Sequence, residues 1–329
     1  MRVNMIKCEK LSRDFKIYTK ESGLKGTLKS FVKREHFIKP AVIDFDLDIK
    51  TPGLLGLLGP NGSGKTTLMK MLTGIIVPSR GKVTVLGYKP SDRKNNFKKK
   101  ISLVMGQKSQ LIWDIPVMDS FLLFQKYYEI EEKLFKKKLH DLGERLDTIK
   151  LFHTPVRKLS LGERMKMEIM SCLLHEPQVI FLDEPTIGLD IVAQKKLRQF
   201  LKEYSEKKKP LIILTSHYMA DVEALCDKIV LLLDGKKTFE GLIEDFKGRF
   251  KRKKTIVFYF DKPVKKKFKE WTKEFHCEWS ANDSQLKVSV SDDRLKEVVI
   301  KAFNSFPVSD FHTEKVGIEE VMDEILSHC

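Results

Sequence analysis

The sequence predicts an α/β protein with a large layered domain followed by a smaller one. Apolar runs of strand length alternate with helix-length segments up to about residue 245. Several of these runs are apolar throughout, which is typical of strands buried on both faces of a parallel sheet. A different pattern begins at the basic run 247–254, so we expect two domains, residues 1–245 and 246–329.

The elements of the first domain follow from these apolar runs and from the helical periodicity between them. We expect strands at 53–58, 82–86, 101–104, 179–182, 211–214 and 229–233, and helices at 65–73, 160–174, 191–206 and 219–226. Residues 17–39 are rich in lysine and lack periodicity, which predicts a surface insertion. Residues 114–155 are expected to form a mostly helical lobe.

The second domain is expected to be a small α/β unit. Its predicted strands are 255–260, 286–290 and a short one before the last helix, and its predicted helices are 264–275, 294–303 and 318–326.

Composition limits the classes of function. With 42% hydrophobic residues the 329-residue chain has enough material for a core, and its net charge of +16 suits an anionic partner. The longest apolar runs, such as 229–233, are too short to span a bilayer, so any membrane role would act through another chain.

Cysteine usage and the start of the chain favour the cytoplasm. The five cysteines are scattered, without zinc-ligand spacing, which predicts free thiols in a reducing compartment; they are Cys8, Cys172, Cys226, Cys277 and Cys329. Charged residues recur from Arg2 onward, so no secretory leader is expected.

A glycine-rich segment between a predicted strand and a predicted helix predicts a phosphate-binding loop. It follows the pattern GxxxxGK[ST] and consists of Gly59, Pro60, Asn61, Gly62, Ser63, Gly64, Lys65, Thr66 and Thr67. Glycines let backbone N–H groups approach phosphates at the positive end of a helix. We expect Lys65 to reach the β- and γ-phosphates and Thr66 to ligate Mg²⁺.

Two adjacent carboxylates end the predicted strand 179–182. At the carboxyl end of a parallel strand, Asp183 can hold Mg²⁺ while Glu184 polarises the attacking water. On its own, such a pair usually marks a strand end that meets solvent. Together with the phosphate loop it predicts nucleotide hydrolysis.

Residues 159–164, Leu-Ser-Leu-Gly-Glu-Arg, resemble the signature motif of ABC transporter ATPase subunits, usually LSGGQ. Residues 184–190 resemble the family's D-loop, residues 215–217 its switch histidine segment, and Gln107 its Q-loop glutamine. Residues from about 5 to 240 match in order and spacing. The resemblance implies a P-loop NTPase of ABC type, with a mixed sheet core, a helical subdomain at about 108–175, and ATP and Mg²⁺ as cofactors.

The same resemblance implies the roles of several residues. Gln107 would act in catalysis and on Mg²⁺, and His217 in catalysis. In the family, two subunits enclose two ATP molecules, so the chain would form a homodimer. Ser160 and the Gly162 backbone N–H are expected at the γ-phosphate of the ATP bound by the partner subunit, and Asp190 is expected to take part in nucleotide binding.

Some positions depart from the family pattern or leave alternatives open. Leu161 and Glu163 replace Gly and Gln, and Glu163 would bring a negative charge that slows turnover. Phe15 is expected to stack on adenine, with Tyr18 as the alternative, and either ring could instead belong to the core.

The resemblance favours the ATPase subunit of an exporter, peripheral on the cytoplasmic face of the membrane and docked on separately encoded integral-membrane permease subunits. Leu111, Ile112 and Trp113 would then form an exposed socket for the permease, although Trp113 could instead pack within the lobe. The basic runs 247–254 and 265–267 could contact anionic lipid, or they could simply be solvated. Export, rather than import, follows from the LSLGE form and the C-terminal extension.

The alternative is a soluble ABC-type ATPase that acts on ribosomes or nucleic acid, which the positive charge would assist. Those relatives generally carry two ATPase domains or a long coiled coil, and this chain has one phosphate loop and one signature motif. We therefore expect no nucleic-acid partner. An unrelated P-loop kinase or GTPase would not explain the signature motif.

Overall fold

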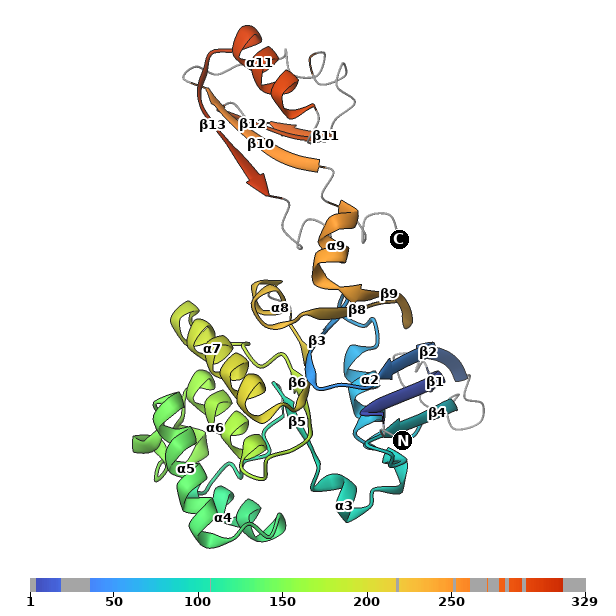
Figure 1. Ribbon diagram of the computed structural model, residues 1–329, viewed down its shortest axis with the longest axis vertical. Coiled ribbons are helices and arrows are strands. Elements are labelled where there is room, and N and C mark those ends of the chain that lie inside the picture. The colour runs from blue at the N-terminus through green and yellow to red at the C-terminus, as the bar shows by residue number, and fades with distance from the viewer. Residues whose placement is uncertain are drawn as a thin grey trace, which may run out of the picture. The chain divides into compact units, whose positions relative to one another are not determined.

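The computed structural model describes residues 4–18, 36–106, 108–216, 219–250, 253–260, 271, 278–281, 284–291 and 294–315 (Figure 1). The chain forms two compact units, Met1–Gly241 and Leu242–Cys329. The boundary expected at 245/246 falls inside helix α9 (Ile243–Phe250) of the second unit.

A six-stranded sheet forms the centre of the first unit, in the order β5-β6-β7-β3-β8-β9. Its strands are β3 (Gly53–Leu58), β5 (Ile101–Met105), β6 (Val179–Asp183), β7 (Leu211–Thr215), β8 (Lys228–Leu233) and β9 (Lys236–Leu242). The pairs β5–β6, β6–β7, β7–β3 and β3–β8 are parallel. β7 is buried along its whole length, as an entirely apolar run predicts.

The register of this sheet determines where the site forms. Asp183 at the end of β6 is the direct partner of Thr215 at the end of β7. β7 in turn pairs with β3, whose end leads into the glycine-rich loop. Because parallel strands end at one edge, the loops after β3, β6 and β7 emerge side by side.

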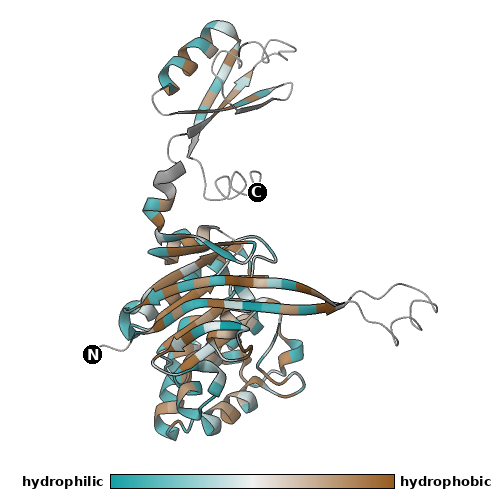
Figure 2. Ribbon diagram, turned by 90° about the vertical axis from the view of Figure 1, so that its right-hand side faces the viewer, coloured by the Kyte–Doolittle hydropathy of each residue, from teal (hydrophilic) through white to brown (hydrophobic). Residues whose placement is uncertain are grey.

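A second, antiparallel sheet has the order β2-β1-β4 and was not expected as a separate sheet. It consists of β1 (Ile6–Tyr18), β2 (His36–Ile49) and β4 (Arg80–Val85). The insertion expected at 17–39 is therefore partly wrong, because residues 17–18 and 36–39 belong to the β1–β2 ladder, whereas 19–35 lie outside the described residues. Figure 2 shows the alternating polar and apolar positions along this long strand pair.

Helices complete the first unit (Figure 1). Those of the lobe are α4 (Val117–Tyr127), α5 (Glu132–Leu146) and α6 (Leu161–Leu173), with the 3₁₀ turns η2 (Ile149–Leu151) and η3 (Val156–Lys158) between α5 and α6. The others are α2 (Lys65–Leu72), α3 (Asn95–Lys98), α7 (Ile191–Lys208), α8 (Met219–Leu225) and the 3₁₀ turn η1 (Pro90–Asp92). One buried cluster joins α2 to both sheets through residues such as Phe45, Leu57 and Met69.

The second unit has a core of its own. After α9, its antiparallel sheet has the order β11-β12-β10-β13. The elements are β10 (Lys253–Phe260), β11 (Glu278–Ala281), β12 (Gln285–Ser291), α11 (Leu295–Ser305) and β13 (Val308–Lys315). Phe258, Leu286 and Val298 are fully buried in this core. β11 was not expected, and the helices expected at 264–275 and 318–326 lie outside the described residues, Trp271 excepted.

Candidate nucleotide site

The glycine-rich loop joins the end of β3 to the start of α2, in backbone conformations that favour glycine. Gly59 and Gly64 have φ values of 143° and 104°. A Cβ atom at Gly59 would lie 2.2 Å from the carbonyl oxygen of Leu232, and one at Gly64 would lie 2.2 Å from that of Ala41. The loop therefore lies so close to the backbone of β8 and β2 that only glycine fits at these two positions.

Lys65 fills the concave side of this loop. Its side chain is only 7% exposed, and its ammonium donates to the carbonyl oxygens of Gly59, at 2.6 Å, and Pro60, at 2.9 Å. Burial lowers the pKa of Lys65, and the carboxylates of Glu184 and Asp183 oppose that shift. An arriving phosphate would offer this ammonium stronger, charged acceptors than the two carbonyl groups.

The other loop residues fit an anionic ligand. Asn61 and Gly62 are exposed at the loop, and Thr67 is half-buried in the first turn of α2. The Ser63 hydroxyl is buried and has no hydrogen-bond partner in the described part of the chain. A buried donor without an acceptor suits a site that phosphate oxygens would complete.

Asp183 connects the loop to the sheet. Thr66 donates from Oγ1 to Asp183 Oδ2 at 2.9 Å, and Thr215 donates from Oγ1 to Asp183 Oδ1 at 2.7 Å. The structure thus brings together Thr66 and Asp183, which are 117 positions apart in the sequence. A hydroxyl and a carboxylate side by side are the hard oxygen donors that Mg²⁺ prefers, so the donor set fits this ion.

Glu184 turns away from the strand that carries it. Its φ of 57° lies in the left-handed region, which is strained for a residue with a side chain. Its backbone N–H donates to both the carbonyl oxygen and the hydroxyl oxygen of Thr215, each at 3.1 Å. Thr215, to which the sequence interpretation gave no role beyond membership of the switch segment, therefore positions both carboxylate residues.

Ser160 begins α6 as its N-cap, in a capping box with Glu163. The Ser160 N–H and hydroxyl both donate to Glu163 Oε2 at 2.8 Å, and the Glu163 N–H donates back to the hydroxyl at 3.2 Å. These bonds to Ser160 lower the pKa of Glu163, which keeps its side chain ionised. The substitution of Glu for the family's Gln therefore has a structural role as a helix cap.

The turn before α7 lies against the signature segment. A Cβ atom at Gly162 would be 2.9 Å from Leu189 Cδ2, and Leu161, 41% exposed, covers Gly188. Asp190 is the N-cap of α7 and accepts a hydrogen bond from the Ala193 N–H at 2.8 Å.

A buried carboxylate that the sequence interpretation missed ties three elements together. Asp221 of α8 is fully buried and pairs with Arg198 of α7 at 2.7 Å. Its other oxygen accepts hydrogen bonds from the hydroxyls of Thr186, in the loop after β6, and Ser216, directly after β7. The only signal in the sequence was an acidic residue close to the expected switch segment.

Glu168 of α6 holds the segment that follows the Q-loop position. Its buried carboxylate accepts hydrogen bonds from the Ser109 hydroxyl and the Gln110 N–H. Burial raises the pKa of Glu168, and these hydrogen bonds oppose the shift.

The socket expected at residues 111–113 is only partly present. Leu111 is 4% exposed, so its expected exposure was wrong; its side chain packs inside the lobe. Ile112 and Trp113 are 44% and 50% exposed, and the Arg164 guanidinium lies 5.7 Å from the centre of the Trp113 ring.

Four predicted site residues remain, and the structure describes the side chain of one of them, Phe15. Gln107 and His217 lie outside the described residues, as does the side chain of Tyr18. Phe15 is half-buried on β1, and the Arg13 guanidinium lies 4.8 Å from the centre of its ring.

The fold and the site define an ATP-binding subunit of the ABC type. Residues 42–187 match the family model described as ABC transporter. The chain is 31% identical over 216 residues to the ABC transporter ATP-binding protein NatA of Bacillus subtilis (strain 168), covering 66% of this chain and 87% of that protein. It is 33% identical to the Nod factor export ATP-binding protein I of Rhizobium sp. (strain N33), covering 66% and 72%. The chain therefore belongs to the ABC transporter ATP-binding proteins, and the resemblance inferred from its motifs is confirmed.

Solved structures confirm the expected fold class. An ATP-binding subunit of an ABC transporter has a TM-score of 0.62 at 23% identity, covering 75% of this chain and 93% of that one. The ATP-binding cassette MJ0796, dimeric and bound to ADP and Pi in a post-hydrolysis state, has a TM-score of 0.61 at 21% identity, covering 73% and 99%. Across the described residues, every helix is too short or too polar to cross a bilayer.

Proposed function

We propose that this subunit hydrolyses ATP as a homodimer and thereby powers export through separate membrane permease subunits. The observation that carries the proposal is the hydrogen-bonded set at the strand edge. Thr66, Asp183 and Thr215 are joined there beside the buried ammonium of Lys65.

Binding begins at the phosphate loop. The backbone N–H groups at the start of α2 and the Lys65 ammonium would take the phosphate oxygens, and Lys65 would exchange its carbonyl partners for them. Thr66 and Asp183 would hold Mg²⁺, which offsets phosphate charge when bound. Phe15 is proposed to stack on the adenine.

Hydrolysis depends on Glu184, which we assign to orienting and deprotonating the attacking water. Thr215 holds Glu184 by accepting a hydrogen bond from the Glu184 backbone N–H, and the left-handed conformation of Glu184 fixes the turn that follows Asp183. Gln107 and His217 are proposed to complete the catalytic set on the basis of the family motifs.

The second half of each site would come from the partner subunit. The start of α6 offers the positive end of a helix, with the Ser160 hydroxyl and the Gly162 backbone N–H for a γ-phosphate. Asp190, which caps α7, lies on the neighbouring turn. Dimer closure on ATP and reopening after hydrolysis would then be a shift between two populations.

Export is supported by the relatives whose names state it, the Nod factor export ATP-binding proteins. No described helix of the chain could span a membrane, and action through a permease subunit would still allow the chain to drive transport. It would place the protein at the cytoplasmic face of the membrane. The exposed Ile112 and Trp113 are a candidate contact with the permease.

The Glu184→Gln variant tests the hydrolytic mechanism. It should bind ATP with unchanged affinity, lose turnover by about a hundredfold or more, and accumulate as a nucleotide-bound dimer. Chromatography with light scattering would detect the nucleotide-bound dimer, and a phosphate-release assay would measure turnover. Undiminished turnover would remove Glu184 as the base.

Affinity purification of the tagged chain from detergent-solubilised membranes tests the proposed partner. We expect a polytopic membrane protein to be recovered in a fixed ratio. Recovery of ribosomes or nucleic acid in its place would favour the soluble ATPase alternative and contradict the transport role.

A further inference from the structure

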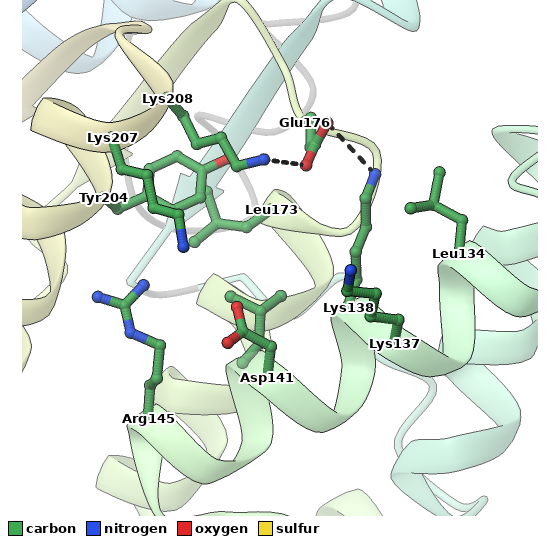
Figure 3. A pocket seen from close by; sticks show the side chains of 11 residues that line it. Leu134, Lys137, Lys138, Asp141, Arg145, Leu173, Glu176, Tyr204, Lys207 and Lys208 are labelled. Carbon is green, nitrogen blue, oxygen red and sulfur yellow. Dashed lines mark hydrogen bonds and ion pairs between the residues drawn. The ribbon is translucent and has the colours of Figure 1, made fainter.

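A basic pocket lies away from the nucleotide site, between helices α5, α6 and α7. It has a volume of about 330 Å³. Five cationic side chains line it, against the two carboxylates of Asp141 and Glu176 (Figure 3). The cations are Lys137, Lys138, Arg145, Lys207 and Lys208.

The ion pairs in the pocket leave a positive excess. Glu176 is shared by Lys208 at 2.6 Å and Lys138 at 3.5 Å. In the described part of the chain, Lys137 and Lys207 have no ion-pair partner, and both are exposed at the rim. Two lysines that line one pocket without ion-pair partners leave positive charge that a bound anion would neutralise.

Arg145 adds a planar donor group to one side. It pairs with Glu203 of α7 at 2.6 Å and lies over the Phe200 ring at 4.9 Å. That packing leaves the Arg145 side chain 24% exposed and restricts the orientation of its guanidinium. Such a fixed fork suits the oxygen atoms of a phosphate.

The floor of the pocket contains a buried hydroxyl that lacks a partner. Tyr204 of α7 is 4% exposed, and within the described residues its hydroxyl makes no hydrogen bond. Figure 3 shows its ring behind the Lys208 side chain, with the hydroxyl oxygen directed toward the Glu176 side of the pocket. A buried hydroxyl without a partner is costly, and an incoming acceptor would satisfy it.

We propose that this pocket binds a compact phosphate-bearing anion, held by Lys137, Lys207 and Arg145 at its rim and by the Tyr204 hydroxyl below. The volume is at the low end for small-molecule sites, which suits one or two phosphate groups. The same chemistry is found in free pyrophosphate or a soluble phosphate ester and in the head group of an anionic phospholipid. Because the lining spans α5 and α7, the bound anion would tie the helical lobe to the core.

Titration calorimetry with inorganic pyrophosphate tests the site at low ionic strength and without Mg²⁺. The full chain would carry Lys65→Ala to weaken pyrophosphate binding at the phosphate loop. Any binding that remains at that loop is the same in all variants and cancels in the comparison. We expect Lys137→Gln with Lys207→Gln to weaken binding by about tenfold or more. The matched control is Lys195→Gln with Lys196→Gln, two exposed lysines of α7 outside the pocket, which should stay within about twofold. Equal losses in both pairs, or no binding by the parent chain, would overturn the proposal.

Tyr204→Phe separates binding from a merely structural role. Without the unpaired hydroxyl the variant should melt at the same temperature or higher, yet bind pyrophosphate about threefold to tenfold more weakly. Unchanged affinity would contradict the assignment of the hydroxyl to the site.

Vesicle flotation distinguishes the two sources of the anion. Binding to phosphatidylcholine vesicles that contain phosphatidate, lost in the Lys137/Lys207 pair and displaced by pyrophosphate, would identify a lipid head group. Pyrophosphate binding without such flotation would identify a soluble anion.

Discussion

Thr215 shows how one hydroxyl can organise a hydrolytic centre. It donates to the Asp183 carboxylate and accepts from the Glu184 N–H, so two residues with different proposed roles depend on the same side chain. Thr215 is fully buried, which prevents water from replacing it easily. Its role is positioning, because it acts on the proposed Mg²⁺ site through Asp183 and on the proposed catalytic carboxylate through the backbone of Glu184.

We expect Thr215→Val to lower kcat by about tenfold and to raise the Mg²⁺ concentration needed for half-maximal activity. The substitution keeps the shape but removes the donor that Thr215 gives to Asp183 Oδ1, at a cost of about 1 kcal/mol for this half-buried carboxylate. ATPase rates over a Mg²⁺ series would measure both effects. Thr215→Ser, which keeps the hydroxyl, should restore most of the activity; equal loss in Ser and Val would show that shape alone matters.

Glu163 has a second consequence for the signature segment. Its carboxylate accepts both donors of Ser160, the residue proposed to meet the partner's ATP. Ser160 would have to give up a charge-assisted hydrogen bond when the dimer closes, at a cost of about 1.5–3 kcal/mol before compensation.

Glu163→Gln should therefore close the dimer at lower ATP concentration and melt a few degrees lower. A neutral amide holds Ser160 less strongly and weakens the capping box by about 1 kcal/mol. Sedimentation of the variant in a hydrolysis-deficient Glu184→Gln background would report dimerisation, and thermal melting would report the cap. Dimerisation at higher ATP concentration than in the parent would contradict this account of Glu163.

At the scale of elements, His175 joins the end of α6 to α4 and β5. Its ring stacks on Tyr128, the C-cap of α4, with centroids 3.7 Å apart, and Nε2 lies 3.1 Å from the Ile101 carbonyl oxygen. Nε2 must therefore carry the proton. Nδ1 is buried without a partner among the described residues, so a second proton there would have no acceptor.

Burial lowers the pKa of His175 from 6.5 to about 4. Because the folded-state pKa lies below the unfolded one, the unfolded chain takes up the proton first, and stability is lost as pH falls from 6.5 toward 4. Between about pH 7.5 and pH 5 the loss should be about 2 kcal/mol of unfolding free energy.

The measurement is urea unfolding of the wild type and His175→Gln at both pH values. The wild type should lose about 2 kcal/mol more than the variant on acidification. His153→Gln, at an exposed histidine of the same lobe, serves as the control and should follow the wild type. Parallel losses in the wild type and His175→Gln would exclude His175 as the group that titrates.

The sequence predicted the central strands well and the surface sheet poorly, for a physical reason. Continuous apolar runs such as 211–214 are buried on both faces and leave a strong pattern. The ends of β1 and β2 are exposed at successive positions, as at 16–17 and 37–40, so they lack the alternation of a half-buried strand and were taken for an insertion.

The same contrast applies to the site. Gly59 to Thr67 and the Asp183–Glu184 pair are local patterns that a sequence displays directly. Thr215, Asp221 and Glu168 act through contacts between residues up to 59 positions apart, and only the folded chain brings those partners together.

At the scale of the whole molecule, the two units have separate cores. The first is centred on α2 and the two sheets, and the second on β10, β12 and α11. Separate cores allow separate unfolding transitions, since each unit buries its own apolar surface.

We expect a chain ending at Gly241 to fold and to bind ATP within about threefold of the full-length affinity. Calorimetry should show two transitions for the full chain and one for the shortened chain, with ATP raising only the transition they share. A shortened chain without a cooperative transition would show that the second unit is required for folding of the first.

The buried Asp221 has a mechanical consequence for the first unit. Its carboxylate joins Thr186, Ser216 and Arg198. Loss of Arg198 would leave a buried charge uncompensated, and loss of either hydroxyl would remove a hydrogen bond from that charge. The turn that leads to Asp190 and the segment that leads to residue 217 are thereby connected through the same carboxylate. We therefore expect a displacement of one of these segments to displace the other, so that in the proposed dimer the turn before Asp190 and the switch segment would move together.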